Sequence, residues 1–176
     1  MWNPTVQKWE NVSTETFATS KVTFDFKFSN WHNGEVMDMN DILHSLYFTI
    51  EWGTQIDEKD KTFDTEFTPR AAQSIQTIVA INQIDEDTVE VYVNYWHFNE
   101  NEIAEWAAIW SPVPWELTAA MEKAVMDGKV SFSRSGATSK SVNWLSLIVP
   151  NDAQIIKEYL KEFRENEFIP NSLKQS

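Results

Sequence analysis

Segment 21–28 constrains the fold more than any other part of the chain, because its apolar and polar residues alternate without a break. The apolar set is Val22, Phe24, Phe26 and Phe28, and the polar set is Lys21, Thr23, Asp25 and Lys27. A period of two places successive side chains on opposite faces of a strand, so this segment predicts a half-buried strand. Asn33 and Gly34 follow it and predict a tight turn, since glycine adopts positive φ without strain.

A capped helix is predicted directly after this turn. Asp38 is expected to be the N-cap residue, and Asp41 adds a negative charge to the first helical turn. The apolar residues that follow form one stripe, made of Met39, Ile42, Leu43, Leu46, Phe48 and Ile50. Gly53 is expected to end the helix, and the charged segment 54–68 predicts a surface loop.

A β-hairpin is predicted in the middle of the chain. Segments 75–84 and 88–96 are rich in β-formers, and the acidic residues 85–87 between them form a short polar reversal. The expected inward face of the hairpin consists of Val89, Val91, Val93 and Tyr95. A strand, a helix and a hairpin therefore precede the C-terminal part of the chain.

Three more helices are expected, at 101–110, at 115–127 before Gly128, and after Pro150. The last one is expected to have Asn151 or Asp152 as its cap. Its buried stripe is predicted to be Ile155, Ile156, Tyr159, Leu160 and Phe163. The Ser/Thr-rich segment 131–141 predicts a flexible loop.

This order of elements is typical of an α+β fold, with a small, mostly antiparallel sheet packed with three to four helices. Neither a repeat nor a change of composition divides residues 1–176, so a single domain is predicted. Residues 1–20 are expected to form an irregular lead-in with room for one short strand. The α+β core is expected at 21–170 and a tail at 171–176.

The charge of the chain excludes one class of partner. Twenty-seven acidic and fourteen basic residues give a net charge of −13, which repels the phosphates of nucleic acids. Residues 85–127 contain ten carboxylates and only Lys123 as a cation. That face favours neutral or cationic partners, although a merely solvated acidic surface is the commoner explanation of such a pattern. No stretch approaches the roughly 18 apolar residues of a membrane-spanning helix.

No catalytic residue, metal site or cofactor is predicted. His32, His44 and His97 are far apart in the sequence and match no metal-ligand spacing, and the chain has no cysteine. A nucleophile-elbow motif and a glycine-rich phosphate loop are absent from the sequence. Paired carboxylates are uninformative among 27 candidates. We therefore predict that the chain is not an enzyme.

The nine tryptophans indicate a large supply of flat aromatic surface. Trp31, Trp96 and Trp110 are the candidate substrate-binding residues, because such rings stack on sugars or on apolar peptide side chains. Core packing is the alternative: Trp106 and Trp110 are four residues apart and share one helix face.

Two segments carry a resemblance to a known family. Segment 28–42 resembles the oligopeptide, dipeptide and nickel class of solute-binding proteins of ABC importers, and His32, Gly34, Asp41 and Ile42 match the family pattern. Trp31, Asn33, Val36 and Asp38 replace the usual Phe, Asp, Pro and Thr, and they preserve the turn and the cap.

The second segment begins at Asp85, where Asp85, Thr88, Val89 and Val91 resemble the hairpin of that family. In the family both segments belong to a subdomain of the N-terminal lobe beside the ligand cleft. The residues Gly34, Asp38, Asp41, Asp85 and Thr88 are therefore expected to be structural, and no ligand contact is carried over from them.

The resemblance implies a fragment of an extracellular or cell-surface receptor that captures peptides or oligosaccharides and delivers them to ABC permease subunits. Complete receptors of this class are several hundred residues long, so an excised subdomain without its second lobe is expected. A free-standing, aromatic-rich carbohydrate-binding module is the alternative, favoured by the tryptophans. A glycoside hydrolase is the third interpretation.

Overall fold

The computed structural model describes residues 1–64, 66, 68–111 and 113–174, and it has the α+β fold that the sequence predicts. Six α-helices lie in the described part of the chain, more than the expected three to four. The elements are β1 (Trp2–Asn3), β2 (Lys8–Trp9), β3 (Ser20–Asp25), α1 (Met39–Gly53), α2 (Thr68–Thr77), β4 (Ile78–Gln83), β5 (Thr88–Val93), α3 (Glu100–Ala107), α4 (Trp115–Met126), β6 (Val130–Ser131), α5 (Arg134–Lys140), β7 (Asn143–Trp144), α6 (Pro150–Glu165) and the 3₁₀-helix η1 (Asn171–Leu173).

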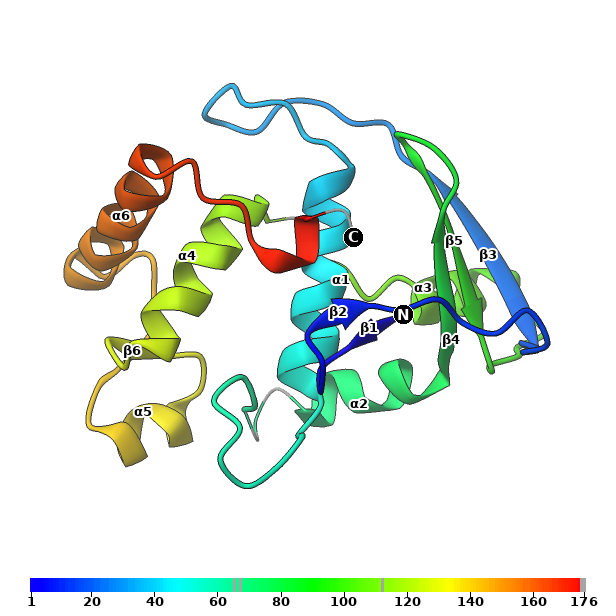
Figure 1. Cartoon of the computed structure of the whole chain (residues 1–176), viewed down its shortest axis with the longest axis horizontal. Coiled ribbons are helices and arrows are strands. Elements are labelled where there is room, and N and C mark those ends of the chain that lie inside the picture. The colour runs from blue at the N-terminus through cyan, green and yellow to red at the C-terminus, as the bar shows by residue number, and fades with distance from the viewer. Residues whose placement is uncertain (65, 67, 112, 175–176) are drawn as a thin grey trace.

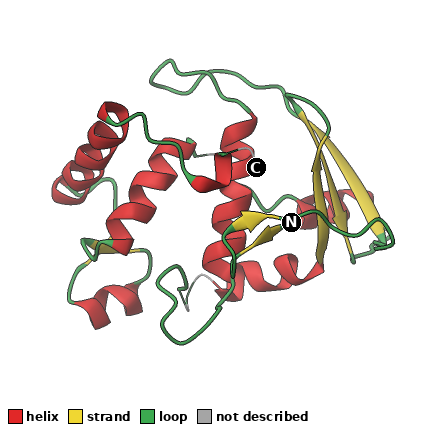
Figure 2. Ribbon diagram, in the orientation of Figure 1, coloured by secondary structure: helices red, strands yellow, loops and turns green. Residues whose placement is uncertain are grey.

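Helix α1 runs through the middle of the molecule (Figure 1). The sheet of β3, β5 and β4, with α3 against it, lies on one side of α1, and helices α4, α5 and α6 lie on the other (Figure 2). The first half of α1 packs toward the sheet through Met39, Ile42 and Leu46. Its last turn packs toward α4 and α6 through Trp52. Most of the predicted apolar stripe therefore packs toward the sheet, but Phe48 packs instead with the cluster of α4 and α6.

The main sheet is antiparallel and has the order β3-β5-β4. Its register places Phe24 opposite Val89 and Asp25 opposite Thr88. The inward-facing valines of β5 are fully buried, which confirms the predicted hairpin face: Val89, Val91 and Val93. The hairpin itself is shorter than predicted, because β4 starts at Ile78 and β5 ends at Val93.

The two chain ends are more ordered than the sequence predicts. Strands β1 and β2 pair within the expected irregular lead-in, and Trp2 is buried. Trp9 Nε1 donates to the backbone oxygen of Ser172 at 2.8 Å. Ser172 Oγ in turn lies 2.8 Å from His44 Nδ1 on α1. Both ends are thus anchored to the same central helix.

The sequence interpretation missed two helices. Helix α2 occupies 68–77, so the strand predicted from residue 75 was wrong at its start. Helix α5 occupies most of segment 131–141, where the predicted flexible loop was wrong. Ser133 is the N-cap of α5 and accepts from the Gly136 N–H at 3.0 Å, which explains how a Ser-rich segment becomes helical.

Helix α6 begins without the predicted cap. Val149 occupies the N-cap position and makes no side-chain cap bond, so the assignment to Asn151 or Asp152 was wrong. Asp152 is fully buried and accepts instead from Asn143 Nδ2 at 2.9 Å and from the Ser146 N–H at 3.1 Å. Its carboxylate therefore fixes the segment that precedes the helix. The predicted apolar stripe of α6 does pack against α4.

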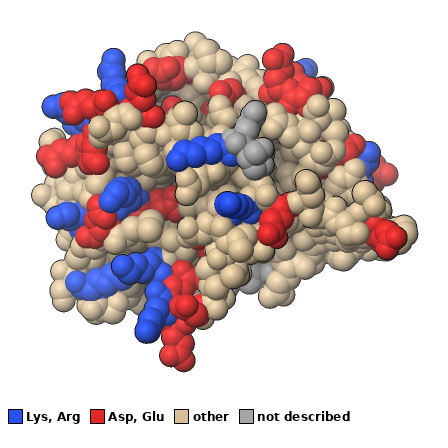
Figure 3. Space-filling view, in the orientation of Figure 1, with Lys and Arg blue, Asp and Glu red and all other residues tan. Residues whose placement is uncertain are grey.

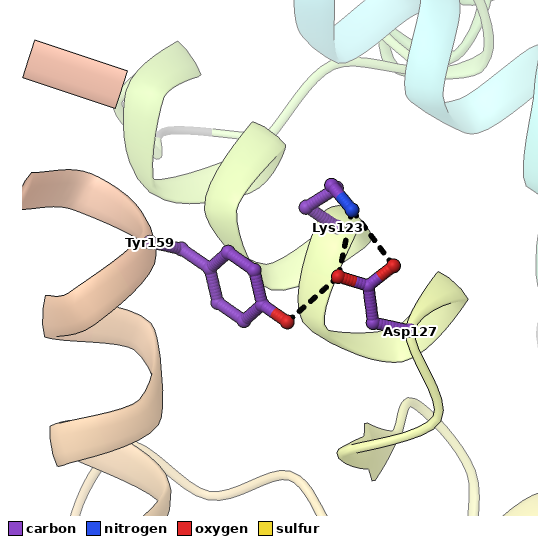
Figure 4. A network of polar contacts seen from close by, with 3 residues as sticks. All are labelled: Lys123, Asp127 and Tyr159. Carbon is purple, nitrogen blue, oxygen red and sulfur yellow. Dashed lines mark hydrogen bonds and ion pairs between the residues drawn. The ribbon is translucent and has the colours of Figure 1, made fainter. Parts of the chain in front are cut away.

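A polar network also links α4 to α6 (Figure 4). Lys123 Nζ donates to both carboxylate oxygens of Asp127, at 2.7 and 2.6 Å, and the Tyr159 hydroxyl donates to Asp127 Oδ2 at 2.8 Å. The hydrogen bond from Lys123 lowers the pKa of Asp127, while burial raises the pKa of Tyr159 to about 12. The network thus adds polar contacts at the edge of an apolar helix pair.

The turn and cap before α1 are confirmed. Gly34 has a φ of 91°, and Asp38 is the N-cap residue, accepting from the Asn40 N–H at 2.8 Å. Asp41 completes a capping box by accepting from the Asp38 N–H at 3.2 Å. The other predicted motif residues, Asp85 and Thr88, lie in the hairpin loop and at the start of β5.

Asp41 does more than cap the helix, because its buried carboxylate also joins distant segments. It accepts from Trp31 Nε1 at 3.1 Å and from the Trp115 N–H at 2.9 Å. Together with the bond from Asp38, three donors from three places depend on this one side chain. The predicted structural role of Asp41 therefore extends to the start of α4.

We expect Asp41→Ala to lower the free energy of unfolding by about 2–4 kcal/mol, because three partly buried donors lose their acceptor. Asp38→Ala serves as the matched variant and should cost about 1 kcal/mol through loss of a cap. Urea denaturation of both variants measures the difference. Equal losses would contradict the role of Asp41 as a junction.

Two buried titratable groups make opposing contributions to stability. Burial raises the pKa of Glu122 on α4 to about 7, and burial lowers the pKa of His44 on α1 to about 4. The folded state binds the Glu122 proton more tightly than the unfolded state, so this contribution is lost as pH rises from 4.5 to 7. His44 has the opposite pH dependence: the stability that comes from its neutral form is present above pH 6.5 and is lost as pH falls from 6.5 to 4.

Glu122→Gln should remove one of these contributions and keep its acceptor oxygen. The free energy of unfolding of the variant, relative to the wild-type protein, is expected to increase by about 3 kcal/mol between pH 4.5 and 7.5. Urea denaturation across this pH range measures the difference, with the exposed Glu158→Gln as the control. A difference that does not change with pH would contradict the burial of a Glu122 carboxyl group that has no cation beside it.

Candidate functional site: an aromatic groove beside strand β3

The three predicted substrate-binding tryptophans lie in three different environments. Trp110 packs edge-on against Phe24 and Phe26, with ring centroids 4.6 and 5.3 Å apart, so it belongs to the core beside the sheet. Trp31 is half-buried at the turn before α1. Trp96 follows β5 and is 68% exposed. The structure therefore does not bring these rings together on one surface.

Most tryptophans of this chain hold distant segments together through their indole N–H groups. Six of the nine donate to an acceptor elsewhere: Trp2, Trp9, Trp31, Trp52, Trp106 and Trp144. Three of these acceptors are the carboxylates of Glu51, Asp41 and Glu122. The abundance of tryptophan is therefore explained mainly by structure, which leaves Trp96 as the best placed of the three candidates to contact a ligand.

Trp96 forms one wall of a groove with a volume of about 770 Å³, which we call the aromatic groove. Phe98 stands beside it and is 83% exposed. The full lining is Ser20, Lys21, Val22, Thr23, Trp96, His97, Phe98, Glu100, Asn101, Ile103 and Ala104. The lining thus comes from β3, from the segment after β5 and from the first turns of α3. Exposed aromatic rings in a concave surface are typical of a binding site.

A row of rings supports the exposed end of this groove. Tyr95 stacks on Trp106 with centroids 4.5 Å apart, and Trp106 Nε1 donates to Thr77 Oγ1 at 2.7 Å. His97 stacks parallel to Tyr95 at 6.4 Å and contacts Phe98 at 4.4 Å. The row extends from a half-buried ring on α3 to the surface. The contact with His97 therefore links the exposed ring of Phe98 to the packed rings of Tyr95 and Trp106.

The groove also follows an open edge of the sheet. Strand β3 pairs only with β5 among the described strands, and the Phe26 N–H donates to the Asp87 oxygen at 2.9 Å. In an antiparallel ladder the residues alternate between the two sides, so the backbone groups of Lys21, Thr23 and Asp25 face away from β5. Four consecutive β3 residues line the groove, which places it along this edge.

The charges near the groove favour neutral or cationic ligands. Segment 85–105 contains seven carboxylates and no Lys or Arg. Lys21 forms an ion pair with Glu90, and this hydrogen bond lowers the pKa of that carboxyl group. On the face shown in Figure 3, basic side chains gather over the half that contains α4 to α6. The first part of the acidic segment 85–127 therefore lies beside the groove, whereas Glu116 and Glu122 lie on α4.

Trp31 lines a smaller hollow of about 240 Å³ near the start of α4. Trp115 is part of the same wall, and the acidic members of the lining are Glu35, Asp38, Asp41 and Glu116. Burial, with the neighbouring carboxylates, raises the pKa of Glu116. Because the Trp31 indole is committed to Asp41, we assign this hollow to the junction of α1 and α4 rather than to ligand binding.

Comparisons with known proteins add no identification, since no family model and no curated protein matches this chain. Within the described residues, no helix is both long and apolar enough to cross a membrane. The same residues contain no group of three or more His, Asp or Glu side chains placed to hold a metal ion. The interpretation of the site therefore rests on the groove itself.

Sequence reasoning identified the aromatic part of the groove at Trp96 and missed the parts that β3 and α3 contribute. Phe98 directly follows Trp96 and His97, and three aromatic residues in a row after a strand were the available signal. The contribution of β3 was not predictable in this way, because pairing decides which edge remains open. Lys21 and Thr23 were assigned only to the polar face of a strand.

We expect Trp96→Ala to change the free energy of unfolding by less than about 0.5 kcal/mol, since the ring has little buried area. Trp110→Ala is the matched variant and should cost about 2–4 kcal/mol by leaving a cavity beside Phe24. Thermal unfolding of both variants measures this. A large loss for Trp96→Ala would assign that ring to the fold and not to ligand contact.

Proposed function

We propose that this chain is a subdomain of a solute-binding receptor of the oligopeptide, dipeptide and nickel class, which captures peptides or oligosaccharides for an ABC importer. The resemblance rests on two segments that are separate in the sequence, 28–42 around Gly34 and 85–91 around Thr88. The observation that best supports the proposal is that these segments belong to one structural unit. Strand β3, which leads into the Gly34 turn and α1, pairs along its length with β5.

A binding role, rather than catalysis, also agrees with the groove. Its lining combines exposed rings, two hydroxyl groups and one open strand edge. The His97 Nδ1 atom accepts from the Asn99 N–H at 3.1 Å. Rings and strand edges recognise ligands without chemical change. In the proposed receptor this surface contributes to the capture of the solute, and permease subunits are the partners that receive it.

Between the two proposed solutes, the geometry favours an extended peptide. The outward N–H and C=O groups of Lys21 and Thr23 can pair with a peptide backbone, which adds a strand to the sheet. Trp96 and Phe98 then supply apolar contacts for alternate side chains. Nearby carboxylates favour peptides that carry Lys or Arg.

The test is a titration of the ¹⁵N-labelled chain with a basic pentapeptide that alternates Lys and Leu. We expect millimolar binding, because a single lobe buries too little of the ligand, with shifts at Lys21, Thr23 and the Trp96 indole. Thr23→Pro should abolish these shifts, since proline removes an outward N–H and is tolerated at a sheet edge. Val22→Pro, which removes a ladder bond, is the folding control.

Cellopentaose is the competing probe for the alternative function, a free-standing carbohydrate-binding module, which the exposed ring of Trp96 favours. Micromolar binding of cellopentaose by the isolated chain, lost in Trp96→Ala and unchanged in Thr23→Pro, would replace the receptor proposal with that module. Release of reducing sugar from a polysaccharide would replace both with a hydrolase.

A further inference from the structure

A second hollow, which shares no residue with the aromatic groove, lies between α1, α4 and the segment around β6 and β7. Its volume is about 380 Å³, which lies in the lower part of the range of small-molecule sites. Six apolar side chains form most of its lining: Phe48, Val113, Met121, Phe132, Leu145 and Leu147. The remaining lining residues are Ser45, Thr49, Ser111 and Thr118, so we call it the hydroxyl pocket.

The aromatic floor of the hydroxyl pocket is fixed by packing. Phe132 meets Phe48 and Trp52 edge to face, with centroids 5.3 and 4.8 Å apart. Trp52 is held in turn by a hydrogen bond from Nε1 to Glu122 at 2.8 Å. The Leu145 N–H donates to the Ser131 oxygen at 2.8 Å. The pocket is therefore formed before any ligand arrives.

The hydroxyl groups of the lining keep unused hydrogen-bonding capacity. Ser45 Oγ accepts from the Ser111 N–H at 2.6 Å, which leaves its own proton free to donate. Thr49 and Thr118 donate to the oxygens of Ile109 and Pro114, at 3.0 and 3.3 Å, and so keep lone pairs that accept. Ser45 and Thr118 are more than nine-tenths buried.

This combination defines the chemistry of the ligand. Ser45, Thr49 and Thr118 thus offer one donor and two acceptors, which match the hydroxyl group of an alcohol or phenol because it accepts and donates at once. No residue of the lining carries a charge, so an ionic ligand would lose its hydration without compensation. The exposed part of the lining is also apolar at Leu147, which is 43% exposed.

We propose that the hydroxyl pocket binds a small uncharged molecule with an apolar ring and a single hydroxyl group, that is, a phenol. Phe48 and Phe132 contact the ring, and Ser45 donates to the ligand oxygen. Thr49 or Thr118 accepts its proton. This site is independent of the aromatic groove and of the receptor proposal.

The experiment is a calorimetric titration of the full chain with p-cresol, toluene and benzoate. We expect p-cresol to bind roughly three to ten times more tightly than toluene, because only p-cresol offers a hydroxyl group. Benzoate should not bind. ¹⁵N spectra should place the shifts at Ser45, Thr49 and Leu145.

Ser45→Ala should weaken p-cresol binding to the level of toluene and leave toluene binding unchanged, whereas a general structural defect would weaken both. Leu147→Trp, at the exposed mouth, should block both ligands without disturbing the buried core. Equal binding of p-cresol and toluene would overturn the proposal. So would the absence of binding, or a concentration-dependent dimer that covers the pocket in sedimentation.

Discussion

Three buried carboxyl groups on or beside α1, none of them paired with a cation in the described part of the chain, are the constraint on which the rest of the structure depends. Asp41 and Glu51 lie near the two ends of α1, and Glu122 faces the same helix from α4. None of them takes part in an ion pair within the described residues. A buried carboxylate is costly unless donors surround it, so the chain must bring indole, hydroxyl and backbone N–H groups to these three places.

This requirement explains the topology around α1 and accounts for three of the nine tryptophans, Trp2, Trp31 and Trp52. Trp2 and Thr62, from opposite sides in the sequence, donate to Glu51 at 2.6 and 3.0 Å. Tyr47 donates to Glu122 at 2.6 Å, as Trp52 does at 2.8 Å. An indole suits this purpose because it is a large apolar ring with one donor and no charge. Hydrogen bonding within the fold is thus the main use of tryptophan in this protein.

Local patterns in the sequence determined much of the fold. The alternation before the Gly34 turn, the Asp38 cap and the stripe of α1 are properties of neighbouring residues, and sequence reasoning found them. Helix α5 was not predicted because serine-rich segments are typical of loops. Only the structure shows that Ser133 caps this helix by accepting from the Gly136 N–H. The cap assigned to Asp152 failed for a related reason, since its partners Asn143 and Ser146 lie across a turn. The groove and the hydroxyl pocket were invisible because both are made by pairing and packing between distant segments.

The central place of α1 has a consequence for how the molecule unfolds. The apolar cluster around Trp52, Ile156 and Phe163 shares no residue with the clusters around the sheet. The sheet with α3 and the group of α4, α5 and α6 contact each other mainly through α1. Cooperative unfolding of the two halves therefore depends on α1 and on its carboxyl groups. Fraying of α1 from either end would turn one all-or-none transition into two separate ones.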